Sequence, residues 1–272
     1  MEMPIAQRVY RHRWPVRVLH WVNVICLTVL LGSGLQIFNA HPSLSWGQAN
    51  TDEGTWLAMG ASRGADNALH GATTLFGHTF RTDGVLGASV VNGHRVQRGF
   101  PAWATIPGPA WLALGRRWHF FFAWVFVING LLYLAWSIGS GHFRKDLVPT
   151  RRDLRGFGQS VWDHLRLRHP QGDEALRYNV LQRLAYLGVI AALCGIALMG
   201  MAMSPRLDAA FPWLVDWVGG RQSARSIHFL LACALVAFLA VHLFEVLISG
   251  VVNQVRSMIT GFYTVKMKVP HE

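Results

Sequence analysis

The segment SIHFLLACALVAFLAVHLFEVLISG, residues 226–250, is the last long apolar stretch of a 272-residue chain. It is long enough to cross a bilayer as a helix, which takes about 20 residues. Its two histidines, His228 and His242, are 14 residues apart. That spacing is close to four helical turns, so both rings leave one face, about 21 Å apart along the axis. Because histidine is costly inside a membrane helix, the pair indicates a function.

Three similar stretches precede this segment, and together they predict the fold class. The chain is 52% hydrophobic and only 14% charged, which is too apolar for an ordinary soluble domain. We predict an all-α membrane protein, a single four-helix bundle over residues 1–272. The transmembrane helices are expected at about residues 18–38, 118–138, 184–203 and 226–250.

The distribution of basic residues predicts the orientation of these helices. Much of the net charge of +11 lies before the first span, between the second and third spans, and after the last. An even number of spans puts these parts on one side, and the positive-inside rule makes it the cytoplasm. We expect a bacterial inner-membrane protein with both termini and loop 141–183 inside. Nucleic-acid binding is not expected, because no basic run outside the spans is interleaved with stacking aromatics.

Residues 39–117 form the longest connection and are expected to lie in the periplasm. The segment carries Trp46, Trp56, Trp103 and Trp111, and an apolar alternation at residues 84–92 is typical of a hairpin. A loop this long inside a compact bundle is usually functional or disordered. Its tryptophans favour a folded cap on the membrane surface that docks a periplasmic partner.

Four of the thirteen histidines lie within or at the ends of the spans. By depth they form two pairs, His119 with His228 on the periplasmic side and His20 with His242 on the cytoplasmic side. Two stacked haem b groups, each with two histidine ligands, require this arrangement. Six-coordinate haem iron suits electron transfer. Covalent c-type haem is excluded, because the three cysteines form no Cys-x-x-Cys-His motif.

Other interpretations of the histidines stay open. A single histidine at a span end is more often an interfacial residue than a ligand, and a haem-free membrane anchor would use all four only for packing. Zinc and copper also bind histidine, but the two pairs lie too far apart to share one ion.

Arginines flank the histidines at both levels, where haem propionates would need neutralising. Arg17 precedes His20, and Arg225 precedes His228. Arg116 and Arg117 stand directly before the segment of His119. Basic residues also anchor helix ends, so this second interpretation remains for each of them.

Glu245 is the only acidic residue inside a predicted span, and it follows His242 by one turn. A carboxylate inside the membrane is a functional candidate. It could relay protons to a quinone bound beside the cytoplasmic haem. The alternative is an acid that snorkels toward the helix end or pairs with arginine.

At three of these histidines the sequence resembles the bacterial di-haem cytochrome b subunits of Ni/Fe-hydrogenases, formate dehydrogenases and thiosulfate reductases. The segments that carry the resemblance are RVLHW (17–21), GRRWHFFF (115–122) and ARSIHF (224–229), with His242 following. The resemblance covers all four spans. It implies that His20, His119, His228 and His242 are the axial haem ligands.

A narrower resemblance concerns the loops. NAHPSLSWG (39–47), RGFPAW (98–103), RYNVLQRLAY (177–186) and RSMITG (256–261) look like the cytochrome b proteins that accompany periplasmic molybdopterin oxidoreductases. The long first periplasmic loop departs from the hydrogenase type and favours a different docking surface.

We therefore expect a di-haem electron-transfer subunit of a quinone-linked oxidoreductase. It would exchange electrons between membrane quinone and a periplasmic redox subunit, with a molybdopterin oxidoreductase as the expected partner. One rival is a self-sufficient cytochrome that oxidises superoxide and reduces quinone. The other rival is the haem-free anchor.

Overall fold

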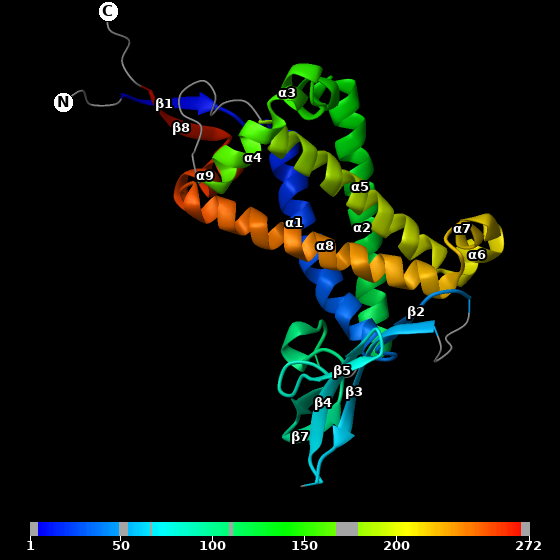
Figure 1. Cartoon of the computed structure of the whole chain (residues 1–272). Helices are drawn as coiled ribbons and strands as arrows, with labels where there is room; N and C mark the ends of the chain where they lie inside the picture. Colours follow the sequence, from blue (N-terminus) through cyan, green and yellow to red (C-terminus); the bar gives the residue numbers. More distant parts are fainter. Residues whose placement is uncertain (1–4, 49–53, 66, 109–110, 167–178, 268–272) are drawn as a thin grey trace, which may run out of the picture. The chain divides into compact units, whose positions relative to one another are not determined.

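The computed structural model describes residues 5–48, 54–65, 67–108, 111–166 and 179–267. His169 and His271, expected in a loop and a tail, lie outside these residues. Four of the described helices are long and apolar enough to cross a membrane, which confirms the predicted number of spans (Figure 1). They are α1 (Trp14–Phe38), α2 (Leu112–Gly139), α5 (Val180–Ala202) and α8 (Arg221–Ile248).

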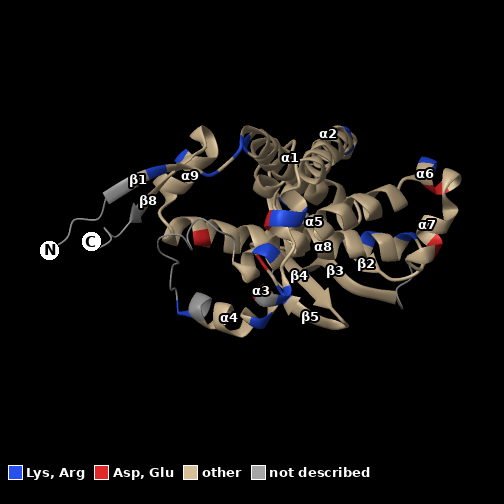
Figure 2. Cartoon of the chain, turned by 90° about the horizontal axis from the view of Figure 1, so that it is seen from above, with Lys and Arg blue, Asp and Glu red and all other residues tan. Residues whose placement is uncertain are grey.

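Each long helix begins four to six residues before its predicted start. Each added stretch ends on a basic residue, and these residues are Arg17, Arg117, Arg183 and Arg225. Apolarity marks only the part of a helix that lies in lipid, whereas backbone hydrogen bonding continues into the interface. Pro15 fits in the first turn of α1, where its missing N–H group leaves no hydrogen bond unmade. Figure 2 shows the central stretches of the four helices almost free of charged residues.

The prediction of an all-α protein is wrong for residues 39–117, where most of the regular structure is β. Four antiparallel strands form one sheet in the order β2-β3-β4-β5, and β6 pairs with β7. The strands are β2 (Ser43–Ser45), β3 (Thr55–Arg63), β4 (Leu69–Leu75), β5 (His78–Arg81), β6 (Ala88–Val91) and β7 (His94–Gln97). The short 3-10 helix η2 (Ala102–Ala104) follows.

The hairpin turns explain the sheet and shift the predicted hairpin. Asn92 and Gly93 join β6 to β7 with φ angles of 50° and 80°. Two-residue hairpin loops with positive φ match the twist of the strands, and Asn-Gly is their preferred sequence. The alternation at residues 84–92 therefore supplies only the first strand and half of the turn. Phe76 and Gly77 form a second turn of this kind, between β4 and β5.

The chain divides into two compact units. Unit 1 holds residues 1–22, 128–193 and 234–272, and unit 2 holds residues 23–127 and 194–233. Each of the four long helices contributes one part to each unit. Unit 2 also contains the sheet and two short helices, α6 (Pro205–Ala210) and α7 (Pro212–Trp217).

Unit 1 joins the two ends of the described chain. Strand β1 (Ile5–Tyr10) pairs antiparallel with β8 (Phe262–Met267), and the short helix α9 (Val251–Thr260) leads into β8. Both ends therefore lie on one side of the membrane, as an even number of spans requires. The connection between α2 and α5 contains the one-turn helix η3 (Phe143–Leu147), α3 (Arg151–Arg155) and α4 (Phe157–Leu165).

The core of unit 2 joins the end of α1 to the sheet. Phe38, Leu44, Leu57 and Met59 are buried together. The ring of Phe38 stacks on that of Phe229 from α8 at a centroid distance of 5.1 Å. This packing fixes the sheet segment beside the first turns of α8, where His228 lies.

Candidate functional site

The first histidine pair lies inside unit 2. The rings of His119 from α2 and His228 from α8 have centroids 6.3 Å apart, with an interplanar angle of 62°. The structure thus brings together two residues that are 109 positions apart in the sequence and were paired by depth alone.

Hydrogen bonds fix which ring nitrogen carries the proton in this pair. His228 Nδ1 lies 2.9 Å from the carbonyl oxygen of Ile196, and because a carbonyl only accepts, Nδ1 is the donor. His119 Nδ1 lies 3.0 Å from Ser33 Oγ. The Ser33 hydroxyl donates its proton to the carbonyl oxygen of Val29 at 2.6 Å, so it accepts from His119. Both rings therefore keep a free lone pair on Nε2, the state that binds a metal.

The second pair lies inside unit 1. The rings of His20 from α1 and His242 from α8 have centroids 6.5 Å apart and an interplanar angle of 67°. The ring of Phe238 stacks against His242 at 5.9 Å. The buried Asn129 side chain donates to the carbonyl oxygen of Leu19 at 3.0 Å and ties α1 to α2 beside His20.

Both separations fit two axial ligands of one iron ion. An imidazole nitrogen binds first-row metal ions at about 2 Å, and the ring centre lies about 1 Å further back, so two axial rings have centres about 6 Å apart. Among the described residues, no group of three or more His, Cys, Asp or Glu side chains could hold a metal ion. A metal at either pair would need its remaining ligands from a macrocycle, which haem provides.

Glycines leave room beside the rings of the unit 2 pair. A Cβ atom at Gly34 would stand 3.4 Å from His119 Cε1, and one at Gly200 would stand 3.5 Å from His228 Cε1. Any longer side chain at these positions would meet an imidazole.

The four arginines predicted to bind a cofactor are engaged differently. Arg225 donates to the carbonyl oxygen of His41, and its guanidinium stands 5.7 Å from the Phe38 ring centre. Arg17 Nη1 donates to the carbonyl oxygen of Ile259 at 2.6 Å. Arg116 stands over Phe120 at 5.7 Å, and Arg116 and Arg117 are both exposed. Arg225 is thus held by the sheet segment, whereas the side chains of Arg116 and Arg117 are accessible to a group bound beside α2.

Arg98 is a buried cation that the sequence did not reveal as part of this site. Its side chain donates to Gln36 Oε1 at 2.6 Å, to Thr105 Oγ1 at 2.9 Å and to the carbonyl oxygen of Phe100 at 3.0 Å. Burial lowers the pKa of Arg98 below its ordinary value. Gln36 lies one turn after Ser33, so this network holds the segment of α1 that contacts His119.

The sheet segment is also hydrogen-bonded to the first turns of α8. The buried Ser226 hydroxyl donates to the carbonyl oxygen of Ser45 at 2.7 Å and accepts from Trp56 Nε1 at 3.0 Å. The Gly47 N–H donates to Ser223 Oγ at 2.9 Å. The segment that precedes His228 is therefore held by β2 and β3.

Glu245 lies on α8 in unit 1, one turn beyond His242, and its side chain is half-buried. It takes part in an interaction within the structure. Its place next to a histidine pair keeps it a candidate for proton transfer.

The match to protein families extends over almost the whole chain. Residues 11–261 match the model of the family described as prokaryotic cytochrome b561. The chain belongs to the prokaryotic cytochrome b561 family. It is therefore a multi-pass membrane cytochrome b that carries haem b and takes part in electron transport.

Three relatives point to oxidoreductase subunits. A protein of Azospira oryzae named as a protein-methionine-sulfoxide reductase subunit, YedZ1, is 37% identical over 132 residues. That match covers 48% of this chain and 64% of the relative, so the chain spans less than two thirds of that protein. A protein of Cupriavidus necator named as a Ni/Fe-hydrogenase B-type cytochrome subunit is 27% identical over 181 residues, which is 60% of this chain and 74% of the relative. A protein of Rhodobacter capsulatus with the same description is 24% identical over 271 residues. That match covers 95% of this chain and 82% of the relative.

Proposed function

We propose that this chain is one cytochrome b domain over residues 1–272 that carries two haem b groups. His119 and His228 hold one group, and His20 and His242 hold the other. The observation that carries this proposal is the geometry of the first pair, whose ring centroids are 6.3 Å apart and whose Nδ1 atoms are both engaged in hydrogen bonds, which leaves Nε2 of each ring for a metal. Haem held in this way takes up and releases one electron at a time without opening an oxygen site.

The residues around each pair have defined tasks in this account. Ser33 and the Ile196 carbonyl orient the two imidazoles of unit 2, and Gly34 and Gly200 leave space beside them. Arg17, Arg116, Arg117 and Arg225 balance the negative charge of the propionates. Such cations are needed because an unpaired carboxylate in a low-dielectric setting is costly.

The same proposal assigns each histidine pair to one side of the membrane. With the N- and C-termini in the cytoplasm of a bacterium, the His20 and His242 pair lies toward the cytoplasmic face of the inner membrane. Membrane quinone reacts there, and Glu245 transfers the accompanying protons. The sheet of residues 39–117 then faces the periplasm beside the other pair.

A periplasmic redox subunit is the partner we propose, and we infer a molybdopterin oxidoreductase. The methionine-sulfoxide reductase subunit among the relatives supports an enzyme partner outside the hydrogenase type. The sheet segment supports it too, because it exposes Phe76, Phe80 and Trp103, with 70%, 56% and 86% of these side chains accessible. Exposed aromatics of this kind are enriched in protein interfaces.

Two measurements test this function. The purified chain, reduced with dithionite, is mixed with a soluble quinone, and reoxidation is followed in the haem absorption bands. We expect both haems to be reoxidised in the absence of any partner. Reduction of the oxidised haems by superoxide, followed by their reoxidation by quinone, would favour the self-sufficient rival. Co-purification of a molybdenum-containing subunit from the native membrane tests the partner separately.

A further inference from the structure

A strongly basic cavity lies in unit 1, among the start of α1, the end of α2 and the residues beside them. Its volume is about 600 Å³. The lining includes four cationic side chains, Arg11, Arg13, Lys145 and Arg183, and the single carboxylate of Asp146. The rings of Tyr10 and Trp136 form part of its walls.

The one carboxylate does not neutralise these cations. Asp146 Oδ2 lies 2.6 Å from His142 Nδ1 and is engaged by that ring. Arg183 pairs instead with Asp153 at 3.4 Å, and Arg11 stands over the ring of Tyr263. Within the described part of the chain, no ion pair engages Arg13 or Lys145. Among the described residues, the cavity therefore presents two cations without an ion-pair partner to an incoming anion.

Burial and the neighbouring charge of Arg11 lower the pKa of His12 to about 4, with smaller contributions from His20 and Arg17. His12 is therefore neutral at pH 7. It lines the cavity as a hydrogen-bonding ring, and the cationic surroundings disfavour a further proton there.

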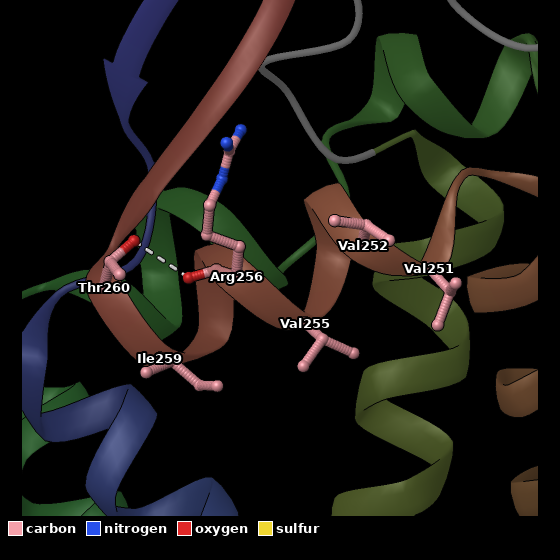
Figure 3. A pocket seen from close by; sticks show the side chains of 6 residues that line it. All are labelled: Val251, Val252, Val255, Arg256, Ile259 and Thr260. Atoms are coloured by element: carbon pink, nitrogen blue, oxygen red, sulfur yellow. Dashed lines mark hydrogen bonds between the residues drawn. The ribbon is translucent and has the colours of Figure 1, made fainter.

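Helix α9 places this end of unit 1 at a membrane surface. Val251, Val252, Val255 and Ile259 line a shallow apolar groove of about 450 Å³, and Figure 3 shows Arg256 pointing away from Val255 and Ile259. The rest of α9 is polar, with Asn253, Gln254 and Ser257. A short helix with one apolar side and one polar side is typical of the lipid interface. It follows α8 after two residues, Ser249 and Gly250.

The helix and the cavity are joined directly. The N–H of Arg11 donates to the carbonyl oxygen of Gly261 at 2.9 Å, and Gly261 packs closely against the ring of Tyr10. The residues that follow the amphipathic helix thus contact the residues that line the cavity. An anion at this level of the membrane is most readily supplied by the bilayer itself.

We propose that the cavity binds the phosphate of an anionic phospholipid headgroup, while the apolar side of α9 lies in the adjoining acyl layer. Arg13 and Lys145 donate to the phosphate oxygens. Basic pockets between membrane helices bind such headgroups through the same contacts. The proposal does not depend on the haem ligands or on quinone chemistry.

The test uses the full-length, haem-loaded chain in detergent, with lipid binding counted by native mass spectrometry. Phosphatidylglycerol is compared with phosphatidylcholine of the same acyl chains. The double variant Arg13→Gln/Lys145→Gln should weaken phosphatidylglycerol binding about 30-fold, from about fivefold for each basic residue at a membrane surface. The matched control is Arg8→Gln/Arg144→Gln, which removes the same charge at exposed residues outside the cavity and should bind as the wild type does.

Four results would overturn the proposal. Equal binding of the two lipids, or equal loss in the control variant, would mean that only net charge matters. Displacement of the lipid by millimolar inorganic phosphate would make the ligand a soluble anion. A fall in the haem-to-protein ratio of Arg13→Gln/Lys145→Gln would make the cavity a propionate site, and this readout separates failure here from failure of the haem proposal.

Discussion

His228 donates a hydrogen bond of 2.9 Å from Nδ1 to the carbonyl oxygen of Ile196. A backbone carbonyl cannot donate, so Nδ1 carries the proton and Nε2 is left for a metal, in a ring whose centroid lies 6.3 Å from that of His119. Both ring orientation and basicity of a ligand are set by such a partner. The pair is therefore organised by contacts within the chain itself.

Replacement of His228 tests the pair most simply. His228→Ala should lose about half of the haem, because one of two groups loses an axial ligand. The other half should keep a six-coordinate spectrum. His94→Ala, at an exposed residue of β7, is the control and should keep its full haem content. Full haem content in His228→Ala would show that this residue is not a ligand.

Ser33 tests the hydrogen bond behind the other ligand. Ser33→Ala removes one acceptor for His119 Nδ1 and should weaken haem retention about 10-fold, at the lower end of the range for partners of metal ligands. The rate of haem transfer to an acceptor globin measures this retention. Thr28→Ala is matched, because among the described residues Thr28 Oγ1 bonds to the carbonyl oxygen of Val24 on the same helix and to no histidine. If the two variants lose haem at one rate, Ser33 does not support the ligand.

Gly200 tests the space beside the ring. Gly200→Val adds methyl groups to a Cβ already 3.5 Å from His228 Cε1, so the imidazole must move. We expect part of the haem to become five-coordinate and high-spin, which is visible in the absorption spectrum. Gly188→Val on the same helix is the control, since a Cβ at Gly188 would meet nothing within 4 Å. An unchanged spectrum in Gly200→Val would place the haem elsewhere.

Glu245 tests the proton path. Glu245→Gln keeps the shape of the side chain but cannot carry a proton, so quinone turnover should fall by about 100-fold or more. Haem content and spectra should not change. Asp216→Asn, at an exposed residue of α7, serves as the control. Normal quinone turnover in Glu245→Gln would mean that the carboxylate transfers no protons and is only a helix-end residue.

The contacts of Asp83 predict how the stability of the sheet segment changes in acid. It contacts His70 Nδ1 at 2.6 Å, Arg95 at 3.2 Å and the N–H of Gly71 at 3.1 Å. The His70 and Gly71 hydrogen bonds, helped by Arg81 and Arg95, hold the pKa of Asp83 well below its ordinary value of 3.8. A carboxyl with a depressed pKa stabilises the fold fully above its unfolded-state value and loses that contribution as pH falls through the folded-state value.

We therefore expect this group to make the melting temperature of the sheet, followed by tryptophan fluorescence, independent of pH near neutrality and to lower it below about pH 4. Asp83→Asn should melt at a lower temperature at neutral pH, and its difference from the wild type should shrink in acid. A constant difference down to pH 2 would mean that the ion pairs contribute nothing.

The sequence predicted the parts of this site that depend on apolarity and helical period. Four long apolar stretches and the 14-residue spacing of His228 and His242 sufficed for the spans and for the pairing by depth. The contacts of Ser33 and of the Ile196 carbonyl could not be predicted, because any residue carries a backbone acceptor and the pairing depends on how α5 packs on α8. Arg98 was quoted only within a loop motif, since its burial depends on the sheet.

The sheet itself was missed for a related reason. Its strands are three to nine residues long, and β2 and β3 are held by contacts with α8 rather than by a strong alternation. Asn92-Gly93 is a hairpin signal in the sequence, but the prediction depended on the apolar run before it.

The most direct test of the central claim is the haem-to-protein ratio of the purified chain, measured with its reduced-minus-oxidised spectrum. Two b-type haems per chain, both six-coordinate, is the result that the two histidine pairs predict. A single haem would mean that one pair is not a binding site. A chain without haem after expression with ample haem would contradict the account.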